Sequence, residues 1–131
     1  VACAGPAYLA AHGRPATPAD LARHACISFE GLMSASAWVF PGQSIEVHSR
    51  LAVTTAEAAI AAAQMGLGVA RVLSYQVAEA VQASTLERLL PDFEPAPVPV
   101  SLIYPGQGRL PMKCRAFLDY AAPRLRERLR P

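Results

Sequence analysis

Side chains able to serve as nucleophiles, bases or metal ligands occur in this sequence, but their spacing predicts neither a catalytic site nor a metal site. No serine lies in the G-x-S-x-G turn that exposes the nucleophile of many hydrolases. No two histidines lie four residues apart, and no two cysteines have the C-x-x-C spacing of a zinc site. We expect the histidines at the surface or at helix ends, and the cysteines as buried, reduced thiols. These residues are His12, His24, His48, Cys3, Cys26 and Cys114.

Two glycines, Gly66 and Gly68, invite comparison with a phosphate-binding loop. In dinucleotide-binding folds such glycines follow a strand and open a helix, so that a phosphate meets the helix N-terminus. Here they follow a predicted helix and precede a predicted strand, and no third glycine is in phase. We therefore interpret the pair as a helix C-cap followed by a turn, and we expect no cofactor.

Glu30 is the carboxylate that a helix cap or a solvent-exposed strand face explains least well. It follows the apolar run 26–29 and precedes a loop of small residues that extends from Gly31 to Ser36. Two interpretations stay open at this point. The carboxylate either lines a binding pocket or is simply solvated.

The composition is that of one folded domain. The chain has 131 residues, of which 53% are hydrophobic and 17% charged, so it can bury a core. Its net charge is only +2, and the arginines between 124 and 130 are interrupted by Glu127, which favours a solvated helix end over a nucleic-acid surface. No membrane span or secretory signal is predicted. The chain begins at Val1 within an apolar run, which suggests a piece of a longer protein.

Strands alternate with helices along the chain, which indicates an α/β fold with a parallel or mixed sheet. We predict strands at 1–4, 26–29, 37–40, 44–48, 50–54, 69–73, 86–90 and 100–104. Two helix starts are the clearest. Thr17 caps a helix that begins at Pro18, and Thr54 with Glu57 forms a capping box. Further helices are predicted at 7–11, 74–82 and 110–128, the last kinked or split by Pro123.

Five segments, taken in order, carry a resemblance to a known family. They read VACAGPAYL at 1–9, GRPATPADL with a following His and Cys-Ile at 13–27, WVF at 38–40, TTAEAAIAAAQMGLGVARV at 54–72, and LIYP, LP and FL between 102 and 118. In this order they resemble the effector-binding region of LysR-type transcriptional regulators. The resemblance covers nearly the whole chain, and the ordered set is more specific than any one motif.

The resemblance implies a fold like that of type-II periplasmic binding proteins, with two α/β subdomains joined by two crossover strands around a ligand cleft. Residues 1–99 would form the second subdomain, beginning at the first crossover, with the proline-rich stretch 91–99 as a linker. Residues 100–131 would return to the first subdomain as a strand and a helix. The rest of that subdomain and the DNA-binding helix-turn-helix would lie outside this sequence.

The same resemblance implies a cytoplasmic sensor that binds a small-molecule effector, for which we consider a carboxylate, and that contacts DNA only through the helix-turn-helix. The loop after strand 26–29 and the helix start at Thr54 would line the cleft, although the threonines could equally serve as caps. Homo-oligomers would form with helix 110–128 at a contact. The predicted effector-binding residues are Ser28, Phe29, Glu30, Gly31, Thr54, Thr55, Gly68 and Val69.

Two other functions compete with this one. A fragment of a solute-binding protein of a transporter would share the fold but would follow a secretory signal. An enzyme on the same architecture, dependent on Glu30, is the least favoured, because no catalytic constellation is present.

Overall fold

A computed structural model of the chain describes residues 1–29, 37–104 and 110–129. The chain divides into two compact units, Val1–Pro95 and Ala96–Pro131. This division lies inside the proline-rich stretch, four residues before the subdomain boundary predicted between 99 and 100. The assignment of the two parts to two subdomains stays a prediction.

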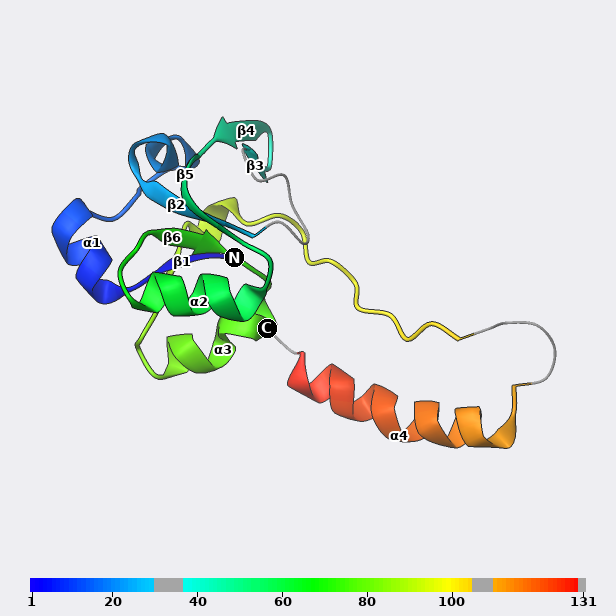
Figure 1. Cartoon of the computed structure of the whole chain (residues 1–131). Coiled ribbons are helices and arrows are strands. Elements are labelled where there is room, and N and C mark those ends of the chain that lie inside the picture. Colours follow the sequence, from blue (N-terminus) through cyan, green and yellow to red (C-terminus); the bar gives the residue numbers. More distant parts are fainter. Residues whose placement is uncertain (30–36, 105–109, 130–131) are drawn as a thin grey trace. The chain divides into compact units, whose positions relative to one another are not determined.

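A mixed five-stranded sheet runs through the described part of the first unit (Figure 1). The central strand β6 is parallel to β2, which is in turn parallel to β5, whereas β1 runs antiparallel to both β6 and β7. The strand order is therefore β5-β2-β6-β1-β7, and the prediction of a mixed sheet is confirmed. The strands are β1 (Ala2–Ala4), β2 (Ala25–Phe29), β5 (His48–Val53), β6 (Val69–Arg71) and β7 (Glu87–Leu89).

Helices α2 (Ala56–Gln64) and α3 (Ser74–Gln82) cover one face of the sheet. The buried residues of α2 are all alanines, Ala56, Ala59, Ala62 and Ala63, so the helix axis can approach the strands closely. Gly5 shows how close the backbone comes, because a Cβ atom there would lie 2.7 Å from the Ala63 carbonyl oxygen. These alanines pack against Ile27 and Ala70 in one apolar cluster.

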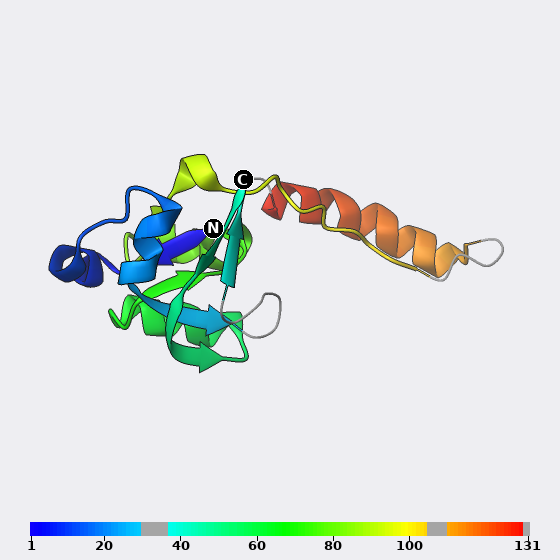
Figure 2. The same cartoon turned by 90° about the horizontal axis from the view of Figure 1, so that it is seen from above.

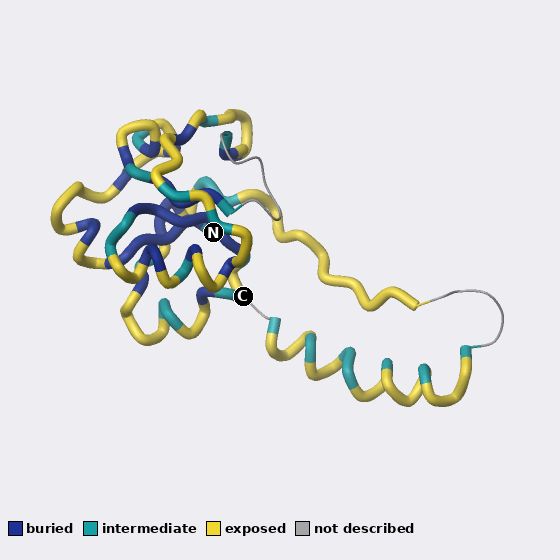
Figure 3. Tube along the Cα trace, in the orientation of Figure 1, coloured by how far each residue is buried: buried dark blue, intermediate teal, exposed yellow. Residues whose placement is uncertain are grey.

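The opposite face of the sheet is covered by α1 (Pro6–His12), by the 3-10 helix η1 (Pro18–Arg23) and by the hairpin of β3 (Ala37–Phe40) and β4 (Gln43–Glu46). Trp38 and Phe40 of the hairpin are buried in a cluster with Tyr8, Leu21 and Leu89. Figure 3 shows β1 and β6 as buried along their length. The core therefore consists of two apolar layers, one on each side of the central strands.

Local capping signals were mostly correct, with two corrections. Gly66 has φ +77°, and its N–H and that of Leu67 bond to the carbonyls of Ala63 and Ala62, which confirms the predicted C-cap. The N-cap of α2 is Thr55 rather than Thr54, because the Thr55 hydroxyl accepts the Ala58 N–H at 3.2 Å. The segment after Thr17 is a 3-10 helix rather than an α-helix, although Asp20 caps it by accepting the Thr17 N–H at 2.9 Å.

In the second unit, α4 (Met112–Arg128) is one helix that continues past Pro123 without a break (Figure 2). Pro123 was predicted to kink or split the helix; the split is wrong, and the kink stays a prediction. The predicted strand at 100–104 is also wrong, since those residues are extended but belong to no sheet. A strand needs a partner for its backbone groups, and residues 100–104 pair with none of the described strands. Among the described residues, no helix is long and apolar enough to cross a bilayer.

Candidate functional site

Three strands of the first unit end at the same edge of the sheet. Because β2, β5 and β6 are parallel, the register that pairs Phe29 with Val53 and Ile27 with Ala70 brings their carboxyl ends together. Ligands of open α/β sheets bind outside the carboxyl ends of parallel strands. The N-terminus of α2 follows directly after β5 at this edge, so the edge combines strand ends with the start of a helix. We call this region the carboxyl edge.

Strand β2 brings two of the predicted site residues to the carboxyl edge. Ser28 is buried on the hairpin side of the sheet, whereas Phe29 is half-buried on the side that α2 covers. The strand alternation therefore sends neighbouring side chains to opposite faces. Glu30 and Gly31, also predicted to line the site, lie outside the described residues.

The helix start contributes Thr54 and Thr55, whose side chains are both exposed. Thr55 uses its hydroxyl to cap the Ala58 N–H, while Thr54 precedes the cap. The first amides of a helix have no intrahelical acceptor and carry a partial positive charge, so an anion is favoured there. Both threonines therefore follow the carboxyl end of β5, as was predicted from the sequence.

Gly68 and Val69 do not join this group, although the sequence suggested that they would. They lie at the amino end of β6, where Val69 pairs with Cys26, and both are buried. A Cβ atom at Gly68 would lie 2.4 Å from the Ala25 carbonyl oxygen, so this glycine serves the close approach of two strands. We therefore leave Gly68 and Val69 out of the proposed site.

Arg71, which the sequence analysis did not select, ends β6 at the carboxyl edge. The residue is only 8% exposed. One guanidinium nitrogen, Nη2, donates to the Val39 carbonyl at 2.6 Å, and the group lies 4.8 Å from the ring centroid of Phe40 and 6.0 Å from that of Trp38. No carboxylate of the described residues lies within ion-pairing distance of it. Its signal in the sequence was a single charge within the apolar run 69–73.

A second group of contacting polar and aromatic side chains lies at the amino end of β2. The Tyr8 hydroxyl accepts the Ala25 N–H at 3.0 Å and lies 3.2 Å from Nδ1 of His24, while the His12 ring stacks on the Tyr8 ring at 4.3 Å. His24 is buried at the C-terminal end of η1, which is one of the two predicted placements, a helix end, and burial lowers its pKa. These residues are remote from the carboxyl edge along the strand.

The cysteines of the sheet are buried and unpaired with one another. Burial raises the pKa of Cys3 to about 11 and that of Cys26 to about 12, so both are thiols at neutral pH. This confirms the prediction for these two residues, while Cys114 is half-buried. A thiol with a raised pKa is a poor nucleophile.

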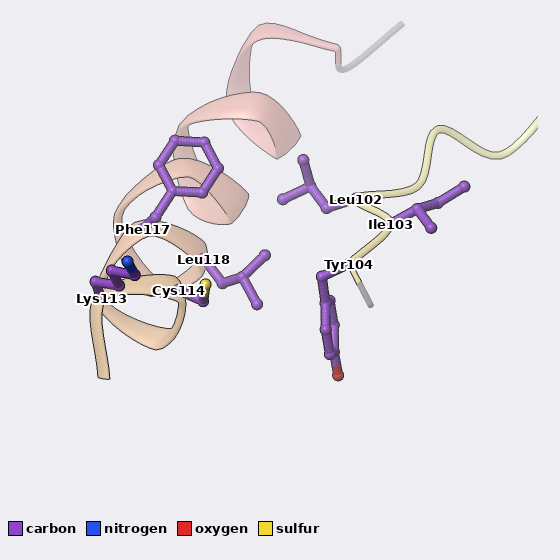
Figure 4. Close-up of a pocket in the computed structure, with 7 residues that line it drawn as sticks. All are labelled: Leu102, Ile103, Tyr104, Lys113, Cys114, Phe117 and Leu118. Atoms are coloured by element: carbon purple, nitrogen blue, oxygen red, sulfur yellow. The ribbon is translucent and has the colours of Figure 1, made fainter. Parts of the chain in front are cut away.

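The second unit has an apolar hollow of about 320 Å³ between residues 102–104 and the first turns of α4 (Figure 4). Leu118 extends from the helix toward the extended segment, whereas Lys113 points away from it. Binding sites for small molecules usually combine apolar walls with a few convergent polar groups. The hollow lacks such a group among its lining residues, which are Leu102, Ile103, Tyr104, Lys113, Cys114, Phe117 and Leu118.

Comparison with known proteins points to regulators of transcription. The family model described as LysR substrate binding domain matches residues 1–126. An uncharacterised HTH-type transcriptional regulator of Escherichia coli K12, YhjC, is 29% identical over 98% of this chain, and the HTH-type regulator PtxR of Pseudomonas aeruginosa is 31% identical over 91%. The chain spans only 45% and 39% of those two proteins. A solute-binding protein of a transporter is therefore not favoured.

Solved structures agree in fold. The regulatory domain of CrgA from Neisseria meningitidis matches with a TM-score of 0.77 at 22% identity, over 95% of this chain and 63% of that one. The regulatory domain of AphB from Vibrio vulnificus matches with a TM-score of 0.73 at 24% identity, over 95% and 63%. The CrgA domain is the regulatory domain of a LysR-type transcriptional regulator, and the predicted periplasmic-binding-protein-like fold is confirmed.

Proposed function

Because this chain belongs to the LysR substrate binding domain family, we propose that its carboxyl edge binds a small-molecule effector and that the chain senses this effector rather than catalysing a reaction. The observation that carries the proposal is the meeting of the ends of β2, β5 and β6 with the start of α2. In the parent protein, effector binding would shift a population of domain arrangements and so control DNA binding.

The proposed ligand contacts come from Ser28, Phe29, Thr54 and Thr55. Phe29 offers a half-buried apolar surface, and the first amides of α2 offer hydrogen-bond donors with a favourable dipole for a carboxylate. Capping by Thr55 does not compete with this role, because the cap satisfies the Ala58 amide and not the amides that precede it.

The wider setting of the domain is also a proposal. The parent would act in the cytoplasm as a homo-oligomer. It would contact DNA through a helix-turn-helix domain, because two of its relatives are HTH-type transcriptional regulators. The exposed apolar side chains of the second unit, among them Phe117 and Met112, would contribute to contacts between chains.

The proposal is tested by amide NMR of the ¹⁵N-labelled chain titrated with sodium benzoate and, separately, with sodium succinate. We expect the largest saturable shifts at the amides of residues 54–57 and 28–29. The amides of Gly68 and Val69 serve as an internal control at the opposite end of the same sheet, and sodium chloride at equal ionic strength controls for salt. Shifts confined to the amino end of the sheet or to the hollow of the second unit would overturn the proposed site.

A further inference from the structure

We propose that Arg71 holds an oxyanion of the effector, carboxylate or phosphate, at the carboxyl edge. This inference rests on the proposed function, which it extends by assigning the residue that supplies the positive charge. Arg71 is the last residue of β6, and β2 lies between it and β5. Neighbouring strands lie about 4.8 Å apart, so the Cα of Arg71 is about 10 Å from the end of β5, and a ligand lying over the end of β2 reaches both.

The first argument is the cost of a buried charge. Arg71 is more than nine-tenths buried and has no carboxylate of the described residues as a partner. Burial lowers its pKa by disfavouring the charged form. A buried guanidinium is stabilised by an anion more than an exposed one is, because the surrounding dielectric constant is lower. An incoming oxyanion therefore gains more at Arg71 than at an arginine in water.

The second argument is orientation. The Val39 carbonyl takes a hydrogen bond from Nη2, and the Phe40 ring lies 4.8 Å from the guanidinium carbon, so the plane of the group is fixed from two directions. An arginine carries five N–H donors in a planar fork that suits carboxylate and phosphate oxygens. No side-chain nitrogen or oxygen of the described residues is fully buried without a partner, so any Arg71 donor that lacks one reaches the surface. A group held in this way binds an oxyanion with little loss of side-chain entropy.

The test follows the Arg71 side chain itself. The Nε–H signals of the ¹⁵N-labelled chain are recorded during titration with sodium benzoate, inorganic phosphate, benzamide as the uncharged match of benzoate, and sodium chloride at equal ionic strength. The Arg71→Lys variant lacks the Arg71 Nε–H, so the signal that disappears from its spectrum is assigned to Arg71. We expect a saturable shift of the Arg71 signal with benzoate, and none with benzamide or chloride. A shift with phosphate as well identifies a general oxyanion site, and its absence identifies a site for organic carboxylates; both support the inference.

Variants measure the contribution of the side chain. We expect Arg71→Gln to weaken benzoate binding about ten- to a hundredfold, the range for losing a charged hydrogen bond. Arg50→Gln removes an exposed arginine of β5 and should change the affinity by less than about twofold. Glu30→Gln removes the carboxylate that directly follows β2 in the sequence and serves as a second charge control. If Arg71→Gln fails to fold, the titrations of the wild type and of Glu30→Gln decide whether Arg71 binds the oxyanion.

The outcomes separate this inference from the proposed function. An Arg71 signal that stays flat in both the wild type and Glu30→Gln, while the amides of 54–57 respond to benzoate, overturns the role of Arg71 and leaves the site intact. A response of those amides and of Arg71 to benzamide alone overturns the oxyanion and keeps an effector site. Flat signals in both places with every probe overturn both proposals.

Discussion

The Tyr8 hydroxyl lies 3.2 Å from Nδ1 of His24 while it accepts the Ala25 N–H at 3.0 Å. A hydroxyl has one proton, and because it already accepts a hydrogen bond from Ala25 it is free to donate that proton to His24. Nδ1 of His24 then acts as an acceptor, which requires the neutral ring with its proton on Nε2. The pair joins α1 to the start of β2, so the protonation state of one buried ring affects the attachment of two elements.

This relationship predicts a pH-dependent stability. Burial lowers the pKa of folded His24, with His12 and Arg23 lowering it further and Asp20 opposing them. The unfolded chain therefore binds the proton first, at a pKa of about 6.5. The contribution of His24 is fully present above that pH and is lost as the pH falls below it toward the folded pKa. The slope cannot exceed about 1.4 kcal/mol per pH unit for one proton.

Urea unfolding between pH 5 and pH 8 measures this slope. We expect His24→Asn to flatten it, and His48→Asn, which replaces an exposed histidine of β5, to leave it unchanged. Equal slopes in the wild type and in His24→Asn would show that other groups set the acid sensitivity.

The two adjacent threonines before α2 differ in one contact. Thr55 accepts the Ala58 N–H, and Thr54 is exposed without capping the helix. We expect Thr55→Ala to lower the free energy of unfolding by about 1 kcal/mol, and Thr54→Ala to change it by less than about 0.5 kcal/mol. Thermal or urea unfolding of the two variants checks this. The reverse ranking would restore Thr54 as the cap, as the sequence had suggested.

Helices α2 and α3 end in the same motif with different residues. Gly66 and Ser84 both have positive φ, +77° and +56°, and each N–H bonds back to the helix, to Ala63 and to Val81. Serine is strained in this conformation, whereas glycine is not. Ser84→Gly should therefore stabilise the chain by about 0.5–1 kcal/mol, and Gly66→Ser should destabilise it by about 1 kcal/mol. Melting temperatures that fall in both variants would contradict this account.

The apolar surface of α4 predicts association between chains. None of its residues is buried, and Phe117 is 61% exposed. We expect light scattering to show association that increases with concentration. Phe117→Ser should raise the midpoint concentration about tenfold, in keeping with the loss of one buried aromatic contact, while Arg115→Ser on the same helix serves as the control. A monomer at every concentration tested would exclude this surface as a contact.

The candidate site was predictable where it depended on neighbours in the chain. A strand that ends at Phe29 and a helix that begins after Thr54 both follow from alternation and capping, so Ser28, Phe29, Thr54 and Thr55 could be selected from the sequence. Arg71 could not, because its partners Val39 and Phe40 lie more than thirty residues away. A charge in an apolar strand has the same local pattern whether it faces solvent or a buried ring.

The sequence by itself determined the family resemblance, the extent of α3 and the turn at Gly66, since caps and helix ends depend on hydrogen bonds within about five residues. Tertiary structure decided which residues meet. The order of β2, β6 and β1 placed Gly68 and Val69 at the amino end of the sheet and Arg71 at the carboxyl edge. It also left residues 100–104 without a sheet. Strand adjacency and register join residues distant in the chain, and that long-range information is not contained in any local pattern.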